Sequence, residues 1–152
     1  MNRWVLLCLL GSLLLIGTSP PPAFAVDEDA ILGRWYTAEK KALVAIYACQ
    51  DRYCGRIVWL KEPKNGDGTD KVDANNPDPN HRRDPIIGLQ LVRDFKFDGN
   101  NGWRGGKIYD PENGKTYSCK MNLSGEARLK VRGYIGVSLL GRTQIWTRAA
   151  QE

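Results

Sequence analysis

Three observations predict that the chain folds as an all-β protein, an eight-stranded antiparallel up-and-down barrel. After position 25, short segments rich in Val, Ile, Tyr and Trp alternate apolar with polar side chains. Gly, Pro, Asn and Asp separate these segments, as in tight turns. No segment after position 25 has a convincing helical period. Consecutive hairpins favour such a barrel, whose closure also removes exposed edges. A β-sandwich, which fits the same alternation, is the alternative.

The expected strands follow one another with short links, except for one long loop. We expect strands at 33–37, 43–49, 55–60, 89–97, 105–109, 115–121, 128–135 and 142–148. The polar residues 50–53 join two apolar strands, which is typical of a hairpin. Residues 110–114 form another hairpin turn, because Pro111 suits its second position and Gly114 supplies a positive φ.

The first 25 residues have the pattern of a secretory signal peptide. Arg3 gives a positive start, residues 5–16 are almost entirely apolar, and residues 23–25 (AFA) supply a cleavage site. The apolar run is shorter than the ~20 residues that span a bilayer, so no stable membrane insertion is expected. An uncleaved anchor is the alternative. We expect an exported protein, periplasmic or secreted, with residues 1–25 as signal peptide and 26–152 as a single barrel domain.

The charge of the exported part is modest. Arg3 is the leader's single charged residue, so 21 basic and 17 acidic side chains leave a net charge of +4. The two signs alternate along the chain without a long run of like charges. Nucleic-acid binding requires a concentrated basic stripe. The sequence therefore predicts no nucleic-acid partner.

Export favours disulfide bonding between the cysteines. Cys49, Cys54 and Cys119 remain after the leader, so one thiol is left over. We expect a disulfide between Cys49 and Cys54 across their hairpin, which would stabilise the fold by about 2 kcal/mol. Two reduced thiols are the alternative. Side-chain alternation places Cys119 inside the barrel as a buried, unreactive thiol.

Alternation also assigns the inward face of the other strands. In the hairpin of residues 43–60, the face without polar side chains is assigned to the interior, namely Val44, Ile46, Ala48, Ile57 and Trp59. The later strands add inward residues by the same alternation: Leu89, Leu91, Phe95, Phe97, Tyr117, Met121, Leu129 and Val131. The rings of Trp59, Phe95 and Tyr117 either fill the barrel or line a cavity, because eight strands allow both.

Arg93 shares the phase of the inward residues of its strand. Either a β-bulge turns it outward, or a cation points into the barrel. A buried guanidinium requires a carboxylate or a bound anion beside it, because burying it alone is very costly. Arg93 is therefore a candidate ligand-binding residue.

Residues 65–85 form a long polar segment that holds one large aliphatic residue, Val72. Loops of this length are usually lids, binding loops or disordered segments. We expect the loop to fold across one mouth of the barrel, anchored by Ile86 and Ile87. A floppy excursion without a role is the alternative.

No motif identifies an active site or a metal centre. The aspartates of the long loop lack EF-hand spacing, and the single histidine leaves too few ligands for structural zinc. His81, Arg82 and Asp84 are the candidates for acid–base chemistry, although a solvated loop histidine is the favoured interpretation. Motifs for nucleophilic catalysis and phosphate loops are absent. We expect no enzyme, no metal and no cofactor.

Two resemblances follow from particular residues. Gly33 and Trp35, with Arg148 closing the last strand, resemble the Gly-x-Trp motif and terminal arginine of the lipocalins, in which the cation packs on the indole. The whole exported part resembles the secreted bacterial family catalogued as domain of unknown function 2147. The stretches that carry this resemblance are CGRIVWL (54–60), NNPDP (75–79), GGKIYDP (105–111), NGKTY (113–117), RGYIG (132–136) and GRTQIW (141–146). The resemblance implies a lipocalin-like barrel in an exported protein, and no reaction.

The leading hypothesis is a binding protein whose barrel holds a small, mostly apolar ligand. The residues expected to contact it are Val44, Ile46, Ile57, Trp59, Leu91, Arg93 and Tyr117. Burial of the ligand would contribute about 25 cal/mol per Å² of apolar surface. The alternative is an envelope-associated protein-binding or structural module with a filled barrel. It would use the outward residues Tyr47, Arg132, Tyr134 and Arg142.

Overall fold

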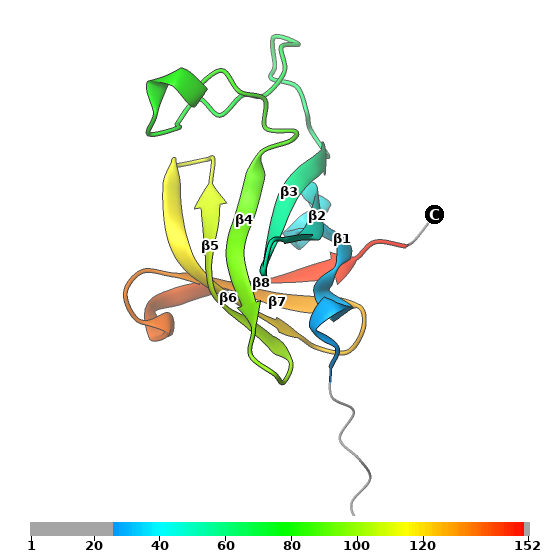
Figure 1. Ribbon diagram of the computed structural model, residues 1–152. Coiled ribbons are helices and arrows are strands. Elements are labelled where there is room, and N and C mark those ends of the chain that lie inside the picture. Colours follow the sequence, from blue (N-terminus) through cyan, green and yellow to red (C-terminus); the bar gives the residue numbers. More distant parts are fainter. Residues whose placement is uncertain (1–25, 151–152) are drawn as a thin grey trace, which may run out of the picture.

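The computed structural model describes residues 26–150 and shows a closed antiparallel barrel (Figure 1). Its strands are β1 (Gly33–Tyr36), β2 (Ala42–Cys49), β3 (Arg52–Leu60), β4 (Gln90–Phe97), β5 (Gly102–Asp110), β6 (Lys115–Leu123), β7 (Arg128–Tyr134) and β8 (Gly141–Arg148). Each strand pairs with the next, and β8 returns to β1. This topology confirms the predicted eight-stranded barrel and excludes the sandwich. The expected signal peptide, residues 1–25, lies outside the described residues.

The seam between β1 and β8 is short and depends on Arg148. Two residue pairs form the seam, Trp35 with Arg148 and Tyr36 with Thr147. The guanidinium of Arg148 lies 4.1 Å from the centroid of the Trp35 ring. It also donates hydrogen bonds to the carbonyl oxygens of Leu32, Ala30 and Glu126. The expected Trp35–Arg148 contact is thus present, and it ties the last strand to the segment that precedes the first.

A short 3-10 helix, η1 (Glu28–Ile31), closes one end of the barrel just before β1. Ile31 is fully buried there. The indole Nε1 of Trp35 donates to the carbonyl oxygen of Ile31 at 2.8 Å, and that of Trp103 donates to Glu28 at 3.2 Å. The largest side chains of the core fill the barrel above this helix: Trp35, Trp103, Trp146, Phe95, Met121 and Leu129.

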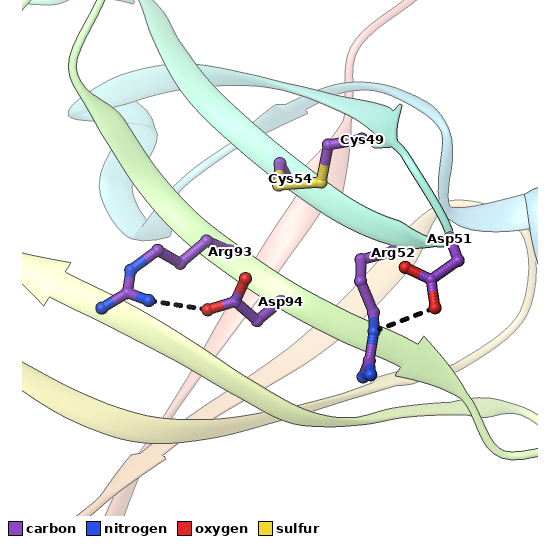
Figure 2. Close-up of a disulfide and its surroundings, with 6 residues drawn as sticks. All are labelled: Cys49, Asp51, Arg52, Cys54, Arg93 and Asp94. Atoms are coloured by element: carbon purple, nitrogen blue, oxygen red, sulfur yellow. Dashed lines mark hydrogen bonds and ion pairs between the residues drawn. A yellow bond between two sulfur atoms is a disulfide. The ribbon is translucent and has the colours of Figure 1, made fainter.

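The β2–β3 hairpin carries the expected disulfide between Cys49 and Cys54 (Figure 2). The turn is tight, since Cys49 pairs with Arg52 and Tyr47 pairs with Cys54. The two cysteines are therefore diagonal neighbours and not direct partners. The strands are thus paired two residues away from the register in which the cysteines would be direct partners. A shift by an even number of residues keeps every side chain on its face, so the faces predicted for Val44, Ile46 and Ile57 are correct, and all three are buried.

Beyond Ile57 the predicted face is wrong for Trp59. Val44 pairs with Ile57, whereas Leu43 pairs with Trp59, so Val58 is an extra residue in β3. This bulge reverses the alternation. Trp59 therefore lies on the outer surface, where its ring meets Tyr36 edge-on at 6.1 Å between centroids.

A second irregularity lies in β4 and decides the position of Arg93. Asp94 has a φ of +66°, and Val92 and Phe95 are both fully buried although they are three residues apart. Arg93 is turned to the outer surface, where its Nη1 lies 2.6 Å from Asp94 Oδ2 (Figure 2). The bulge alternative is correct, and the prediction that Arg93 faces the cavity is wrong.

We expect a carboxylate introduced into β2 to destabilise the protein strongly on the inner face of the strand and little on its outer face. In Val44→Asp a carboxylate replaces a fully buried side chain, which lowers the free energy of unfolding by at least about 3 kcal/mol or prevents folding. In the neighbouring Ala45→Asp the new carboxylate lies between Arg34 and Arg56 on the outer face, and the change is within about 0.5 kcal/mol. Urea unfolding of both variants measures the difference. Equal midpoints would contradict the assigned faces.

Candidate functional site

The half of the barrel away from η1 contains a cavity of about 1290 Å³. Its mouth lies among four connections: the β1–β2 link, the β3–β4 loop (residues 61–89), the β5–β6 turn and the β7–β8 connection. Apolar side chains line the inner part: Ala42, Ile57, Leu91, Ile108, Val131 and Trp146. Polar and charged side chains gather nearer the strand ends: Glu39, Lys41, Lys61, Glu62, Lys71, Tyr109, Asp110, Glu112, Asn113 and Arg142. Gln144 lies deeper, where it pairs with Val131 and its Oε1 accepts a hydrogen bond from Trp146 Nε1 at 3.2 Å.

The cavity exists because inward side chains are large in one half of the barrel and small in the other. Trp35, Phe95 and Trp103 fill the half near η1 and are fully buried. Toward the mouth the corresponding inward position in β7 is Gly133, which pairs with Cys119. A Cβ there would lie 3.3 Å from Ile108 Cγ2. Trp146 lines the cavity while only 1% of its surface is exposed, so it forms part of the floor.

The structure divides the seven predicted ligand-binding residues into three groups. Ile57, Leu91 and Tyr117 line the cavity. Val44 and Ile46 face inward but belong to the packed core, outside the cavity lining. Trp59 and Arg93 lie on the outer surface because of the bulges in β3 and β4.

Sequence reasoning missed three apolar residues of the inner lining, Ala42, Ile108 and Trp146. Ala42 lies one residue before the predicted start of its strand. The alternation of side chains could have identified the other two. Ile108 pairs with the inward residue Tyr117, and Trp146 pairs with the inward residue Leu129. The phases of β5 and β8 are therefore the signal that could have identified them.

The β3–β4 loop crosses the top of the barrel in Figure 1 and reaches over the β5–β6 turn. It is held by its own short bridges, Lys64 with Asp70 and Val72 with Pro85. Ile86 is buried in the core, as expected for an anchor, but Ile87 is exposed and does not anchor the loop. The loop contributes Lys71, Val72, Ala74 and Ile86 to the cavity lining.

A buried carboxylate joins this loop to the barrel. Asp73 is fully buried. Its Oδ1 accepts a hydrogen bond from the Tyr109 hydroxyl at 2.8 Å, and its Oδ2 accepts one from Asn76 Nδ2 at 2.7 Å. Its backbone N–H donates to the carbonyl oxygen of Asp84 across the loop. Because each oxygen of the buried carboxyl group accepts a hydrogen bond, Asp73 fixes the loop against β5.

A second contact joins the loop to the β5–β6 turn. Asn75 Nδ2 donates to the carbonyl oxygens of Glu112 at 2.9 Å and Pro111 at 3.2 Å. Gly114 follows at a φ of +68°, and a Cβ there would overlap the carbonyl oxygen of Asn75. Only glycine allows this approach between the two segments.

The cations at the mouth differ in their partners. Lys41 lies 3.5 Å from Glu39, and Lys71 lies 3.8 Å from Glu62. Lys61 and Arg142 also line the cavity, and within residues 26–150 neither forms an ion pair. Asp110 and Glu112 line the same entrance. A ligand in the cavity therefore meets mainly apolar side chains inside and charged side chains of both signs at the entrance.

The candidate catalytic residues lie outside the cavity lining. His81 is exposed, and its Nδ1 lies 2.7 Å from Asp84 Oδ2, which raises the pKa of the imidazole. Arg82 donates to the carbonyl oxygen of Asn76. Cys119 is buried as expected, and burial raises the pKa of its thiol to about 12. Residues 26–150 contain no cluster of three or more His, Cys, Asp or Glu side chains that could hold a metal ion.

In the part of the chain that the structure describes, no helix has the length and apolar character needed to cross a membrane.

Comparisons with known proteins agree with this architecture. Residues 33–148 match the model of a family described as "Uncharacterized protein conserved in bacteria (DUF2147)". Among solved structures the chain is similar to protein HP1028 of Helicobacter pylori, which is described as belonging to the lipocalin family. The TM-score is 0.69 at 22% identity, with 80% of this chain and 84% of the other covered. A search of the curated proteins found no match.

We expect Tyr109→Phe to loosen the β3–β4 loop. The change leaves the barrel intact but removes a hydrogen bond to the buried charge of Asp73, so local opening becomes more favourable. Amide hydrogen exchange at Asp73, Asn76 and Ile86 is expected to accelerate at least about tenfold. Tyr47→Phe, on the outer face of β2, is the control. Unchanged exchange in Tyr109→Phe would contradict the role of this bond.

The same contact predicts a loss of stability at high pH. Burial, followed by the hydrogen bond to Asp73, raises the pKa of Tyr109 from 10.0 to about 12. The folded state therefore favours the neutral hydroxyl, and this contribution is complete below pH 10 and lost as the pH rises through 12. Between these pH values the melting temperature of the natural protein should fall more steeply than that of Tyr109→Phe. Parallel curves would show that Tyr109 does not titrate as described.

Proposed function

We propose that this chain, which belongs to the bacterial family of uncharacterized proteins DUF2147, binds a small and mostly apolar molecule in the cavity of its barrel. The observation that carries the proposal is the cavity itself. At about 1290 Å³ it is large enough for a small ligand, since ligand pockets usually measure ~300–1,000 Å³. The lipocalin-like fold supports the same class of function, because such barrels enclose room for one small molecule.

The lining favours one orientation of the ligand. Ile57, Ile108 and Val131 would bury its apolar part at the depth of the barrel, close to the indole of Trp146. A polar end would lie at the entrance, where Lys61, Arg142, Asp110 and Glu112 offer charged groups of both signs. Burial of apolar surface supplies about 25 cal/mol per Å², and a charge that stays at the entrance avoids the cost of full desolvation.

The arrangement of rings supports ligand binding over the alternative of a filled barrel. Of the rings that could have filled the centre, Phe95 lies in the packed half and Trp59 lies outside. Tyr117 lines the cavity instead of closing it. The β3–β4 loop would then act as a partial cover, because it contributes Val72 and Ile86 to the wall and is fixed through Asp73.

Export is part of the proposal. The disulfide between Cys49 and Cys54 supports it, because such bonds persist in oxidising compartments. The sequence pattern of residues 1–25 points the same way. We accordingly place the ligand in the periplasm or outside the cell.

A ring placed inside the barrel should abolish binding, whereas the same ring outside should not. Val131→Phe adds volume in the cavity, and Val58→Phe adds it on the exposed face of β3. The probe is anilinonaphthalene sulfonate, an apolar ring system with an anionic end. Fluorescence titration should show at least about tenfold weaker binding for Val131→Phe, since the ring displaces contacts that contribute more than 1.4 kcal/mol.

Native mass spectrometry of the protein purified from its own host tests the function without a chosen probe. A co-purifying small molecule that is retained in Val58→Phe and lost in Val131→Phe is the expected result. Circular dichroism establishes that both variants are folded. If probe and natural ligand bind Val131→Phe as tightly as the natural protein, the cavity is not the binding site.

A further inference from the structure

The barrel collects its positive charge on one side. Strands β5 to β8 contain nine Lys and Arg residues and a single acidic residue, Asp110. In β6 and β7 the inward residues are the buried Cys119, Met121, Leu129 and Val131, so the alternate residues face outward. Four of these outward residues are cations, and Lys107 of β5, which pairs with the outward Ser118, adds a fifth. We call these five residues the basic face: Lys107, Lys120, Arg128, Lys130 and Arg132.

The register places these cations side by side. Lys120 pairs with Arg132, and Lys107 lies in the adjacent row, where it pairs with Ser118. Within residues 26–150 no member of the basic face forms an ion pair. The face therefore presents uncompensated positive charge, which attracts an extended anionic surface.

Aliphatic side chains project from the end of the same strands. The connection between β7 and β8, residues 135–140, we call the tip loop, and it lies at the left in Figure 1. Ile135, Val137, Leu139 and Leu140 are 69%, 62%, 86% and 76% exposed. Single exposed aliphatic residues are ordinary, but four within six residues form a patch that requires a partner. Ile135 and Leu140 also line the mouth of the cavity.

Arg132 fixes the tip loop to the basic face. Its Nε donates to the carbonyl oxygen of Ser138 at 2.8 Å, and its Nη2 donates to that of Leu139 at 3.1 Å. Its Nη1 donates to Thr143 Oγ1 in β8 at 2.8 Å. The backbone of the loop is thus held by the guanidinium while its aliphatic side chains remain in water. The tip loop and the adjoining cations of the basic face thus form one continuous surface.

We propose that this surface docks on an anionic lipid bilayer. The aliphatic side chains of the tip loop enter the interfacial region, and Arg132, Lys120 and Lys107 contact lipid phosphates. Docking places the mouth of the cavity at the lipid surface, because Ile135 and Leu140 belong to both. The docking is peripheral and reversible, and the form of the protein that docks is the one without a bound ligand.

The composition of the surface favours lipid over other partners. Protein interfaces are enriched in aromatic residues, Met and Arg at their centre, whereas the tip is purely aliphatic in its apolar part. Single-stranded nucleic acids stack their bases on aromatic side chains, and the tip loop offers none. An amphipathic surface with a basic side and an aliphatic edge matches the chemistry of an interface between phosphate groups and acyl chains.

Sedimentation with vesicles tests the proposal. Vesicles of phosphatidylcholine are compared with vesicles that also contain phosphatidylglycerol, and only the latter should bind the protein, less so at high salt. Val137→Ser with Leu139→Ser should weaken binding at least about tenfold. Neither residue lines the cavity, so binding of anilinonaphthalene sulfonate stays unchanged and the two proposals are tested separately. Val58→Ser with Ile87→Ser, exposed aliphatic residues elsewhere, is the control.

A second pair of variants tests the charge. Lys107→Gln with Lys120→Gln should weaken vesicle binding about 25-fold, or about fivefold for each cation removed. Arg34→Gln with Lys96→Gln removes the same charge from the exposed outer side of β1 and β4, away from the mouth of the cavity, and should have a smaller effect. Circular dichroism shows that all variants are folded.

Four outcomes would overturn the proposal. The first two are no binding to phosphatidylglycerol vesicles, and equal vesicle binding by the tip variant (Val137→Ser with Leu139→Ser) and its control. The third is an equal loss of vesicle binding in both pairs of charge variants. The fourth is a natural protein that is dimeric, with a tip variant that alone is monomeric. The last result would make the tip loop a contact between copies of the chain. Binding to DNA that the tip variant leaves intact, without vesicle binding, would assign the basic face to nucleic acid instead.

Discussion

Closure of the barrel rests on Arg148. The seam that it stabilises consists of two residue pairs, so the backbone ladder alone is short. The guanidinium adds a stacked indole, Trp35, and three carbonyl oxygens from the segments on either side of the seam. Burial opposes its charge and lowers the pKa of Arg148, and the carbonyl acceptors offset that cost. Without closure the interior would have no wall between β8 and β1, and there would be neither a core nor a cavity.

Within the closed barrel, side-chain volume decides where there is room. Large rings occupy the half near η1, and Ala42, Ile57 and Gly133 leave the other half hollow. This division reconciles two demands that compete in a small barrel. The packed half supplies the buried apolar area that a chain of this length requires, and the hollow half is free to bind. The hydrogen bonds to both oxygens of Asp73 let the β3–β4 loop form part of the wall without a large apolar contact of its own.

Charged and exposed aliphatic side chains are distributed unevenly over the outer surface of the barrel. Acidic residues concentrate in the β3–β4 loop and near η1, whereas β5 to β8 carry nine cations and one carboxylate. The exposed aliphatic tip loop continues the two most C-terminal strands of that basic side. The mouth of the cavity thus opens beside an amphipathic edge, so the proposed ligand site and the proposed docking surface share Ile135 and Leu140.

Alternation and turn chemistry in the sequence determined the eight strands, their order, the disulfide and the inward faces of Val44, Ile46 and Ile57, because these depend on residues close in the chain. Family motifs added the contact of Arg148 with Trp35. Only the tertiary structure decided the rest. Two bulges reversed the phase at Trp59 and Arg93. A charged residue in the inward phase left a bulge at Arg93 as one of two alternatives, whereas the apolar pattern before Trp59 gave no sign of an extra residue. The partners of Asp73, the hollow above Trp146 and the gathering of alternating charges into one basic face arise between strands, because pairing brings together residues that the chain keeps apart.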